Sequence, residues 1–240
     1  MEENRLIILG NSHLQIISNQ SQIVDKLVSL NNEVLGQIFL NRGLQDAKLH
    51  KYNKAVLNFT RAISAYPELV YAYTNRAQMY MILREWDNSL KDFCKAIELK
   101  PTDETYINRG KYFARIKQDQ KELDDYISAS IVNPKSKKAF HCLYVKYFKY
   151  LKDYEKAIDV STKFINIDPS YHMGYLIRAR THFARGDYVG AIADLTKSVE
   201  LFPMTTSYEL RAKSYEMLNQ HDRAKSDYKM ALIYSTTTSS

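Results

Sequence analysis

Apolar residues recur at helical spacing along most of the chain, with polar positions between them. Tyr73, Ala77 and Tyr80 fall on one face of a helix. After a polar turn at Arg84 and Glu85, a second helical stripe follows: Leu90, Phe93, Ala96 and Ile97. Neither stripe alternates as a half-buried strand would. This stretch therefore predicts a pair of antiparallel helices joined by a short turn.

Prolines divide the chain into units of nearly constant length. They stand 34, 33, 35 and 34 residues apart: Pro67, Pro101, Pro134, Pro169 and Pro203. Because proline cannot continue a helix, its regular recurrence indicates the end of a regular unit. A period of this length is typical of a solenoid of repeated helix pairs. One more unit follows Pro203, with Thr236 in the place of the closing proline.

A small residue precedes the proline by 24 positions in four units: Gly43, Ala77, Gly110 and Ala179. Together with the period, the alanine and aromatic positions of the second helix and the closing proline, this pattern resembles the tetratricopeptide repeat family. The resemblance implies an all-α fold, a right-handed superhelical solenoid of antiparallel helix pairs. Glu122, Val145 and Phe164 depart from the family pattern, so we expect looser or shifted packing around the third and fourth units.

The resemblance covers six repeats in residues 36–236. Residues 1–35 form a separate N-terminal segment, in which a helical stripe predicts a capping helix: Ile23, Leu27, Leu30 and Val34. Residues 5–18 fit either a short hairpin or a helix, and the pattern does not decide between them. The last residues, 237–240, are expected to form a frayed tail.

Two columns of the repeat change together. The residue just before the small position is arginine in five units, and sixteen positions later comes an acid or an amide. The fourth unit lacks both. Partly buried charges tend to be paired, because an orphaned charge is costly. We therefore expect Arg76 to pair with Asp92 and Arg178 with Asp194; the alternative is a row of ligand-binding arginines.

Composition favours a folded protein, since 45% of the residues are hydrophobic and 25% are charged. Cys94 and Cys142 cannot build a disulfide framework, and no apolar run approaches the ~20 residues that span a bilayer. Acids precede the short apolar run at the N-terminus, unlike in a signal peptide. We expect a cytoplasmic protein with no membrane partner. The formal net charge of +7 favours acidic partners but is not by itself a nucleic-acid signature.

The sequence contains no constellation for catalysis or metal binding. No two of the six histidines have zinc-ligand spacing, and neither a Cys-x-x-Cys motif nor a phosphate-binding glycine loop occurs. His182 stands in an aromatic core column and is expected to pack there. His141 and Cys142 are adjacent on a predicted helix, point in different directions and have no orienting partner. We expect no enzyme, no catalytic residue, no metal and no cofactor.

In the family, the first helix of each repeat lines the concave side of the solenoid. Two positions on this helix carry polar groups that would face the groove: Asn41, Asn75 and Asn108 at one, and Lys111, Lys146, Arg180 and Lys213 at the other. Asparagine offers a donor and an acceptor, so a ladder of asparagines can hold the main chain of an extended peptide. A row of cations favours an acidic segment.

Both features have plainer interpretations. Asparagine followed by arginine is a common dipeptide in these repeats, and the cations could form a solvated helix face. Some family members bind chaperone tails through a two-carboxylate clamp, but its flanking positions here hold other residues: Leu40, Leu44, Thr74, Gln78, Glu104, Ala139 and Leu143. Chaperone tails are therefore not expected to bind in that way.

These patterns predict a non-enzymatic adaptor or scaffold whose concave groove binds a protein or peptide partner through an extended or helical, acidic segment. One alternative is a basic helical-repeat protein that binds RNA; the charge permits it, but no regular column of exposed aromatics interleaves with the basic residues. Another is self-assembly, in which arrays stack end to end through incompletely capped terminal helices.

Overall fold

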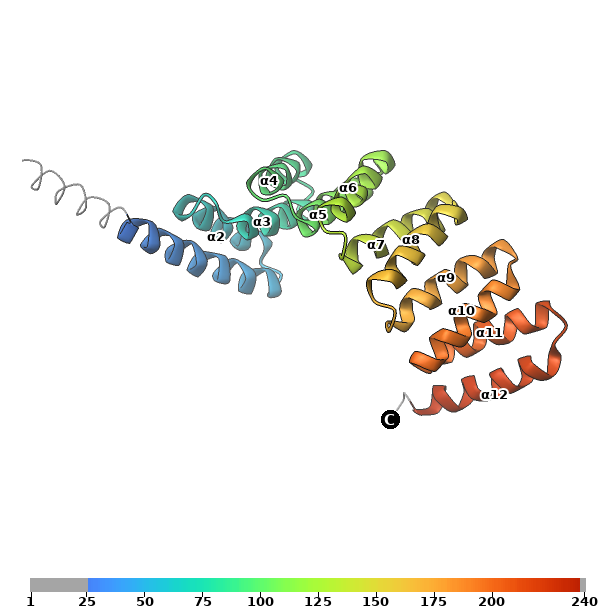
Figure 1. Ribbon diagram of the computed structural model, residues 1–240. Helices are drawn as coiled ribbons and strands as arrows, with labels where there is room; N and C mark the ends of the chain where they lie inside the picture. Colours follow the sequence, from blue (N-terminus) through green and yellow to red (C-terminus); the bar gives the residue numbers. More distant parts are fainter. Residues whose placement is uncertain (1–25, 238–240) are drawn as a thin grey trace, which may run out of the picture. The chain divides into compact units, whose positions relative to one another are not determined.

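The computed structural model describes residues 26–237, and all regular structure in that range is helical (Figure 1). The chain divides into two compact units, Met1–Pro101 and Thr102–Ser240. Residues 1–25 and 238–240 lie outside the described part. The segment 5–18, for which the sequence left a hairpin or a helix open, therefore lies outside it too.

The first unit contains a helix of residues 26–48, followed by α2 (Tyr52–Ala65), α3 (Val70–Ile82) and α4 (Trp86–Leu99). The helix of residues 26–48 runs without a break across the boundary that we placed between residues 35 and 36. The predicted capping segment thus continues directly into the first helix of repeat one. Its apolar side chains Leu27, Leu30 and Val34 are 61%, 50% and 57% exposed.

The second unit contains the remaining elements: α5 (Asp103–Arg115), α6 (Asp119–Val132), α7 (Lys137–Val145), the π-helix η1 (Lys146–Leu151), α8 (Tyr154–Ile167), α9 (His172–Arg185), α10 (Tyr188–Leu201), α11 (Thr205–Met217) and α12 (His221–Thr237). Each α-helix of this unit packs against the next one along the chain, and α9 also touches α11 (Figure 1). The first helices of successive repeats therefore lie near one another.

The turns of the repeat follow a common plan. Each proline stands two residues beyond the end of a second helix, as Pro67 does after Ala65 and Pro169 after Ile167. At the opposite turn, one residue in each repeat has a positive φ: His50, Arg84, Lys117, Lys152, Gly186 and Asn219. That conformation costs a non-glycine residue about 1 kcal/mol or more. The packing of the two helices therefore imposes the turn in four repeats, since only Gly186 and Asn219 are residue types that favour this conformation.

The small column marks close approach of the two helices within a repeat. A Cβ atom added to Gly43 would lie 2.5 Å from Cε1 of Phe59, and one added to Gly110 would lie 2.6 Å from Cε1 of Tyr126. The fourth repeat exchanges the two sizes, with a large residue, Val145, in the small column and a fully buried Ser161 sixteen positions later. Such an exchange keeps the total volume between the helices nearly constant.

The fourth repeat also holds one residue more than the usual 34 between its prolines. Its first helix continues from α7 directly into the π-helix η1. A π-turn absorbs an extra residue without ending the helix. The structure therefore contains a register shift in the repeat where the sequence pattern led us to expect one.

Candidate functional site: the first helices of the second unit

The predicted arginine–aspartate pairs are present. Arg76 donates from Nε and Nη2 to the two carboxylate oxygens of Asp92 at 2.7 and 2.8 Å, and Arg178 does the same to Asp194 at 2.8 and 2.7 Å. Two further repeats contain the same ion pair: Arg109 with Asp125 and Arg211 with Asp227. All four carboxylates are buried. These arginines stabilise the repeats, so we do not count them as candidate ligand-binding groups.

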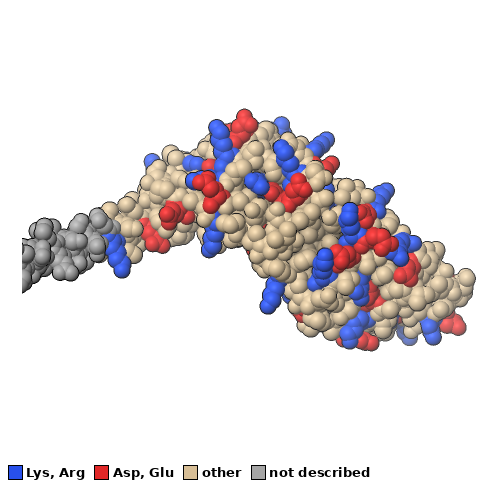
Figure 2. Space-filling model, turned by 45° about the horizontal axis from the view of Figure 1, so that its top comes forward, with Lys and Arg blue, Asp and Glu red and all other residues tan. Residues whose placement is uncertain are grey.

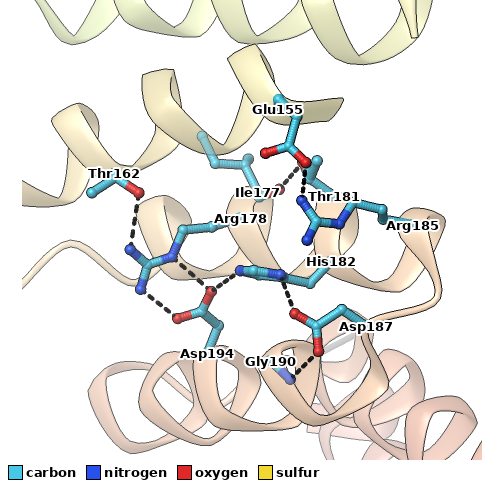
Figure 3. Close-up of polar contacts among 10 residues, drawn as sticks. All are labelled: Glu155, Thr162, Ile177, Arg178, Thr181, His182, Arg185, Asp187, Gly190 and Asp194. Atoms are coloured by element: carbon cyan, nitrogen blue, oxygen red, sulfur yellow. Dashed lines mark hydrogen bonds and ion pairs between the residues drawn. The ribbon is translucent and has the colours of Figure 1, made fainter. Parts of the chain in front are cut away.

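Figure 3 shows that the pair in repeat five reaches a third helix. Nη1 of Arg178, on α9, also donates to Oγ1 of Thr162, on α8, at 3.1 Å, while Asp194 lies on α10. One guanidinium therefore connects its own repeat to the preceding one. Arg76 and Arg211 make the equivalent bond to a threonine of the preceding repeat, at 3.0 and 3.2 Å.

His182 belongs to the same polar network rather than to an apolar core. Its Nδ1 lies 2.7 Å from Oδ2 of Asp187, and its Nε2 lies 3.8 Å from Oδ2 of Asp194 (Figure 3). Asp187 also accepts from the backbone N–H of Gly190 at 2.9 Å and so caps α10. The bond from Gly190, with a further contribution from His182, lowers the pKa of Asp187. His182 therefore packs between the helices as expected, with 18% of its side chain exposed, but its neighbours there include two carboxylates.

Repeat one lacks the pair, although Arg42 and Asn58 occupy its two columns. Nδ2 of Asn58 donates instead to Oδ2 of Asp46 at 2.8 Å, and the Arg42 guanidinium lies 5.7 Å from the centroid of the Phe39 ring. An amide carries no charge to neutralise a guanidinium, and it can donate to a nearby carboxylate. The expected equivalence of amide and acid in this column was therefore wrong.

The three candidate asparagines are not deeply buried. Asn41 is exposed, and Asn75 and Asn108 are half-buried. Nδ2 of Asn75 donates to the main-chain oxygen of Tyr71 at 2.7 Å, so the amide nitrogen of this side chain is already engaged in a hydrogen bond. Asn41 and Asn75 belong to the first unit, whereas Asn108 belongs to the second, together with the candidate cations.

Three of the four candidate cations are exposed: Lys111 on α5, Arg180 on α9 and Lys213 on α11. They occupy equivalent positions in their helices. Lys213 lies beside a hollow between α11 and α12 that Glu209 and Tyr228 also line. The structure therefore brings three of the predicted cations to the surface of the first helices.

Lys146 does not belong with them, and its prediction as a groove residue was wrong. Only 2% of the residue is exposed, and its Nζ lies 2.6 Å from both Oδ1 of Asp119 and Oε2 of Glu122. Burial by itself lowers the pKa of Lys146, but the hydrogen bonds to the two carboxylates outweigh this effect, and the pKa lies above its usual value. The sequence held a signal for this contact, because Glu122 stands in a small core column and needs a counter-charge.

A pocket with a volume of about 490 Å³ opens between the helices of the third, fourth and fifth repeats. Its lining comes from α5, α7, α8 and the start of α9: Ile107, Lys111, Lys137, Lys138, His141, Cys142, Phe164, Tyr171, Met173 and Ile177. The sequence pattern placed Lys111 in the groove but did not indicate the other two lysines. His141 and Cys142 both line this pocket.

Between residues 26 and 237, no three His, Cys, Asp or Glu side chains gather in a way that could hold a metal ion. Over the same range, no helix combines the length and the apolar character needed to cross a membrane. On the face shown in Figure 2, basic and acidic side chains are interspersed rather than gathered into one basic field.

Helix pairs that repeat with the prolines and pack along each unit define a helical repeat protein. The tetratricopeptide repeat family model matches residues 70–103. A repeat-containing protein from Cytophaga hutchinsonii superimposes with a TM-score of 0.68 at 19% identity, over 83% of this chain and 80% of that one. Residues 70–103 thus match a tetratricopeptide repeat, and the predicted all-α fold of repeated helix pairs is confirmed.

Two curated relatives align with parts of the chain. Mouse sperm-associated antigen 1 is 32% identical over 47% of this chain and 12% of its own length. The Arabidopsis thaliana Hsp70-Hsp90 organizing protein 3 is 34% identical over 37% of this chain and 16% of its own length. The chain thus corresponds to less than a fifth of either relative.

Proposed function

We propose that this protein is an adaptor that binds an extended, acidic segment of a protein partner along the first helices of its second unit. The proposal depends on a difference between two basic positions of the first helix, one of which is paired within the protein while the other is exposed. Arg178 is held by an aspartate, whereas Arg180, two residues further along α9, is exposed. Among residues 26–237, no ion pair forms with Lys111, Arg180 or Lys213.

Exposed cations without a partner on the protein are free to attract carboxylates of another chain, which supports speed and selectivity of association. Asn108 precedes Lys111 by one helical turn and can exchange hydrogen bonds with a peptide main chain. Asn41 and Asn75 are proposed to do the same in the first unit. The name of the Arabidopsis relative, an organizing protein for Hsp70 and Hsp90, is in keeping with an adaptor.

Affinity capture from lysate tests the proposal, with a double variant, Arg180→Glu with Lys213→Glu. A matched control changes two exposed lysines of α12 by the same charge, Lys225→Glu with Lys229→Glu. We expect the first variant to lose the proteins that the natural chain captures and to show a flatter salt dependence, because salt screens exposed charges. The control should retain them.

A triple variant in which Asn41, Asn75 and Asn108 become alanine should bind more weakly with little loss of stability. Capture that is unchanged in the Arg180 and Lys213 variant would contradict the proposed groove. Capture that nuclease abolishes would favour the RNA-binding alternative instead.

A further inference from the structure

The pocket of the second unit has an apolar floor. Ile107, Phe164 and Ile177 lie there with only 3%, 5% and 2% of their surfaces exposed. Met173 and Cys142 complete the apolar part of the lining and are half-buried. Filling such a floor with an apolar group removes water from a concave surface, which is the main source of affinity in pockets of this size.

The rim of the pocket is cationic. Nζ of Lys137 lies 2.6 Å from Oδ2 of Asp168 and 4.7 Å from the centroid of the Tyr171 ring, so this lysine is already engaged. Lys111 and Lys138 are exposed, and neither forms an ion pair within residues 26–237. Among the described residues that line the pocket, none is acidic. Two cations at the edge of an apolar floor are therefore left for a ligand.

One substitution in the repeat pattern makes this pocket different from its counterparts. Phe164 stands in a column that holds alanine or serine in the other repeats: Ala62, Ala96, Ala129, Ser198 and Ala231. Its ring packs edge-on against Tyr171, with the centroids 5.9 Å apart, and so helps to shape one side of the pocket. The other repeats lack this ring, so the pocket can fix the register of a bound segment.

We infer that this pocket takes one bulky apolar side chain of the bound segment, with acidic residues on either side of it that reach Lys111 and Lys138. This inference rests on the proposed function. It adds that the bound segment contains one bulky apolar residue between acidic residues. A purely acidic segment would leave the apolar floor without contacts, and a purely apolar ligand would leave the two lysines uncompensated. A side chain such as phenylalanine, leucine or methionine between carboxylates satisfies both parts.

End-blocked peptides test the inference, because blocked termini remove any contribution from a terminal carboxylate. The probe carries one phenylalanine between runs of aspartate and glutamate, and its counterpart carries alanine in that place. Calorimetric titration of the full chain should show that the phenylalanine peptide binds about thirtyfold more tightly, as expected for a side chain that fills a pocket. Equal affinities would overturn the pocket while leaving the acidic groove intact.

Cys142→Trp fills the pocket without changing its charge. It should abolish the preference for phenylalanine and leave binding of the alanine peptide unchanged. In the variant Lys111→Glu with Lys138→Glu, both peptides should bind at least tenfold more weakly, whereas Lys225→Glu with Lys229→Glu on α12 should have little effect. If the phenylalanine preference survives in Cys142→Trp, the side chain binds elsewhere and the inference is wrong.

The natural cysteines supply a second measurement that does not depend on the folding of any variant. Cys142 lines the pocket, whereas Cys94 is exposed in the first unit. Saturating phenylalanine peptide should slow alkylation of Cys142 by iodoacetamide at least tenfold and leave the rate at Cys94 unchanged. Equal rates with and without the peptide would overturn the inference. Protection by dodecanoate but not by the peptide would do so too, and would make the pocket a site for small amphiphilic acids.

Discussion

A buried ion pair stabilises repeat five and another stabilises repeat four, but the two pairs join different helices. The pair of repeat five joins the two helices of that repeat, and the pair of repeat four joins it to repeat three. In repeat five, Arg178 of α9 pairs with Asp194 of α10, inside one repeat. In repeat four these two columns hold the uncharged Tyr144 and Val160. The buried pair there links neighbouring repeats instead, from Lys146 to Glu122 of α6. The arginine–aspartate pair recurs in four repeats and so forms a visible column, whereas the pair between repeats occurs once and leaves no column.

Repeat four departs from the pattern at several matched positions. Val145 is large where other repeats are small, and Ser161 is small where they are large. The residue that follows Val145 begins the π-helix, and it is the buried Lys146. Each departure is compensated by another one in the same or the adjacent repeat, so the fold persists although the consensus is lost.

The largest expected effect concerns the pair between repeats. Lys146→Met leaves Glu122 buried without its counter-charge, so the free energy of unfolding should fall by about 3 kcal/mol. Urea denaturation followed by circular dichroism measures this. Lys149→Met, an exposed neighbour, should stay within about 0.5 kcal/mol. Adding Glu122→Ala restores the small residue of the column and should recover most of the loss; no recovery would show that the charge pair is not the cause.

A smaller effect is expected for the pair within repeat five. Arg178→Ala leaves Asp194 without its main partner, but 23% of the Arg178 side chain is exposed and water can enter, so we expect a loss of about 2 kcal/mol. A double-mutant cycle with Asp194→Ala should give a coupling energy of about 1 kcal/mol or more. The exposed pair of Arg185 with Glu155 serves as the comparison, and Arg185→Ala should cost less than about 1 kcal/mol. Additive effects of Arg178→Ala and Asp194→Ala would contradict the structure.

The smallest effect concerns the solvated pair of Lys137 with Asp168 beside the pocket. The hydrogen bond from Lys137, and after it those from Ser170, lower the pKa of Asp168 to about 2. Because this pKa lies below the unfolded value of about 3.9, the contribution of Asp168 to stability is present above that pH and is lost as the pH falls towards 2. In Lys137→Met, carboxyl NMR titration should show the pKa moving back towards its ordinary value, whereas Lys135→Met should leave it in place. An unchanged pKa in Lys137→Met would show that Lys137 is not the cause.

The sequence by itself determined the helix pairs, the ends of the second helices near the prolines and four of the ion pairs. The ends of the second helices followed from the prolines, because proline lacks the N–H that continues a helix and disfavours helical backbone in the residue before it. The pairing of Arg76 and Asp92 could be predicted because the repeats are replicates of one local structure, and both columns change together. Lys111, Arg180 and Lys213 came from the same periodicity, which places equivalent positions on equivalent helix faces.

Three features became apparent only in the tertiary structure. They are the burial of Lys146, the continuity of the helix of residues 26–48 and the pocket lined by Cys142. Each depends on contacts or on helix continuation across the boundary between repeats, in places where the residues follow no repeating column. Lys146 and Lys111 occupy the same position within their repeats. Glu122 of repeat three forms an ion pair with Lys146 and not with Lys111. A periodic pattern describes what each repeat shares, whereas burial and the shape of a pocket depend on which particular side chains meet.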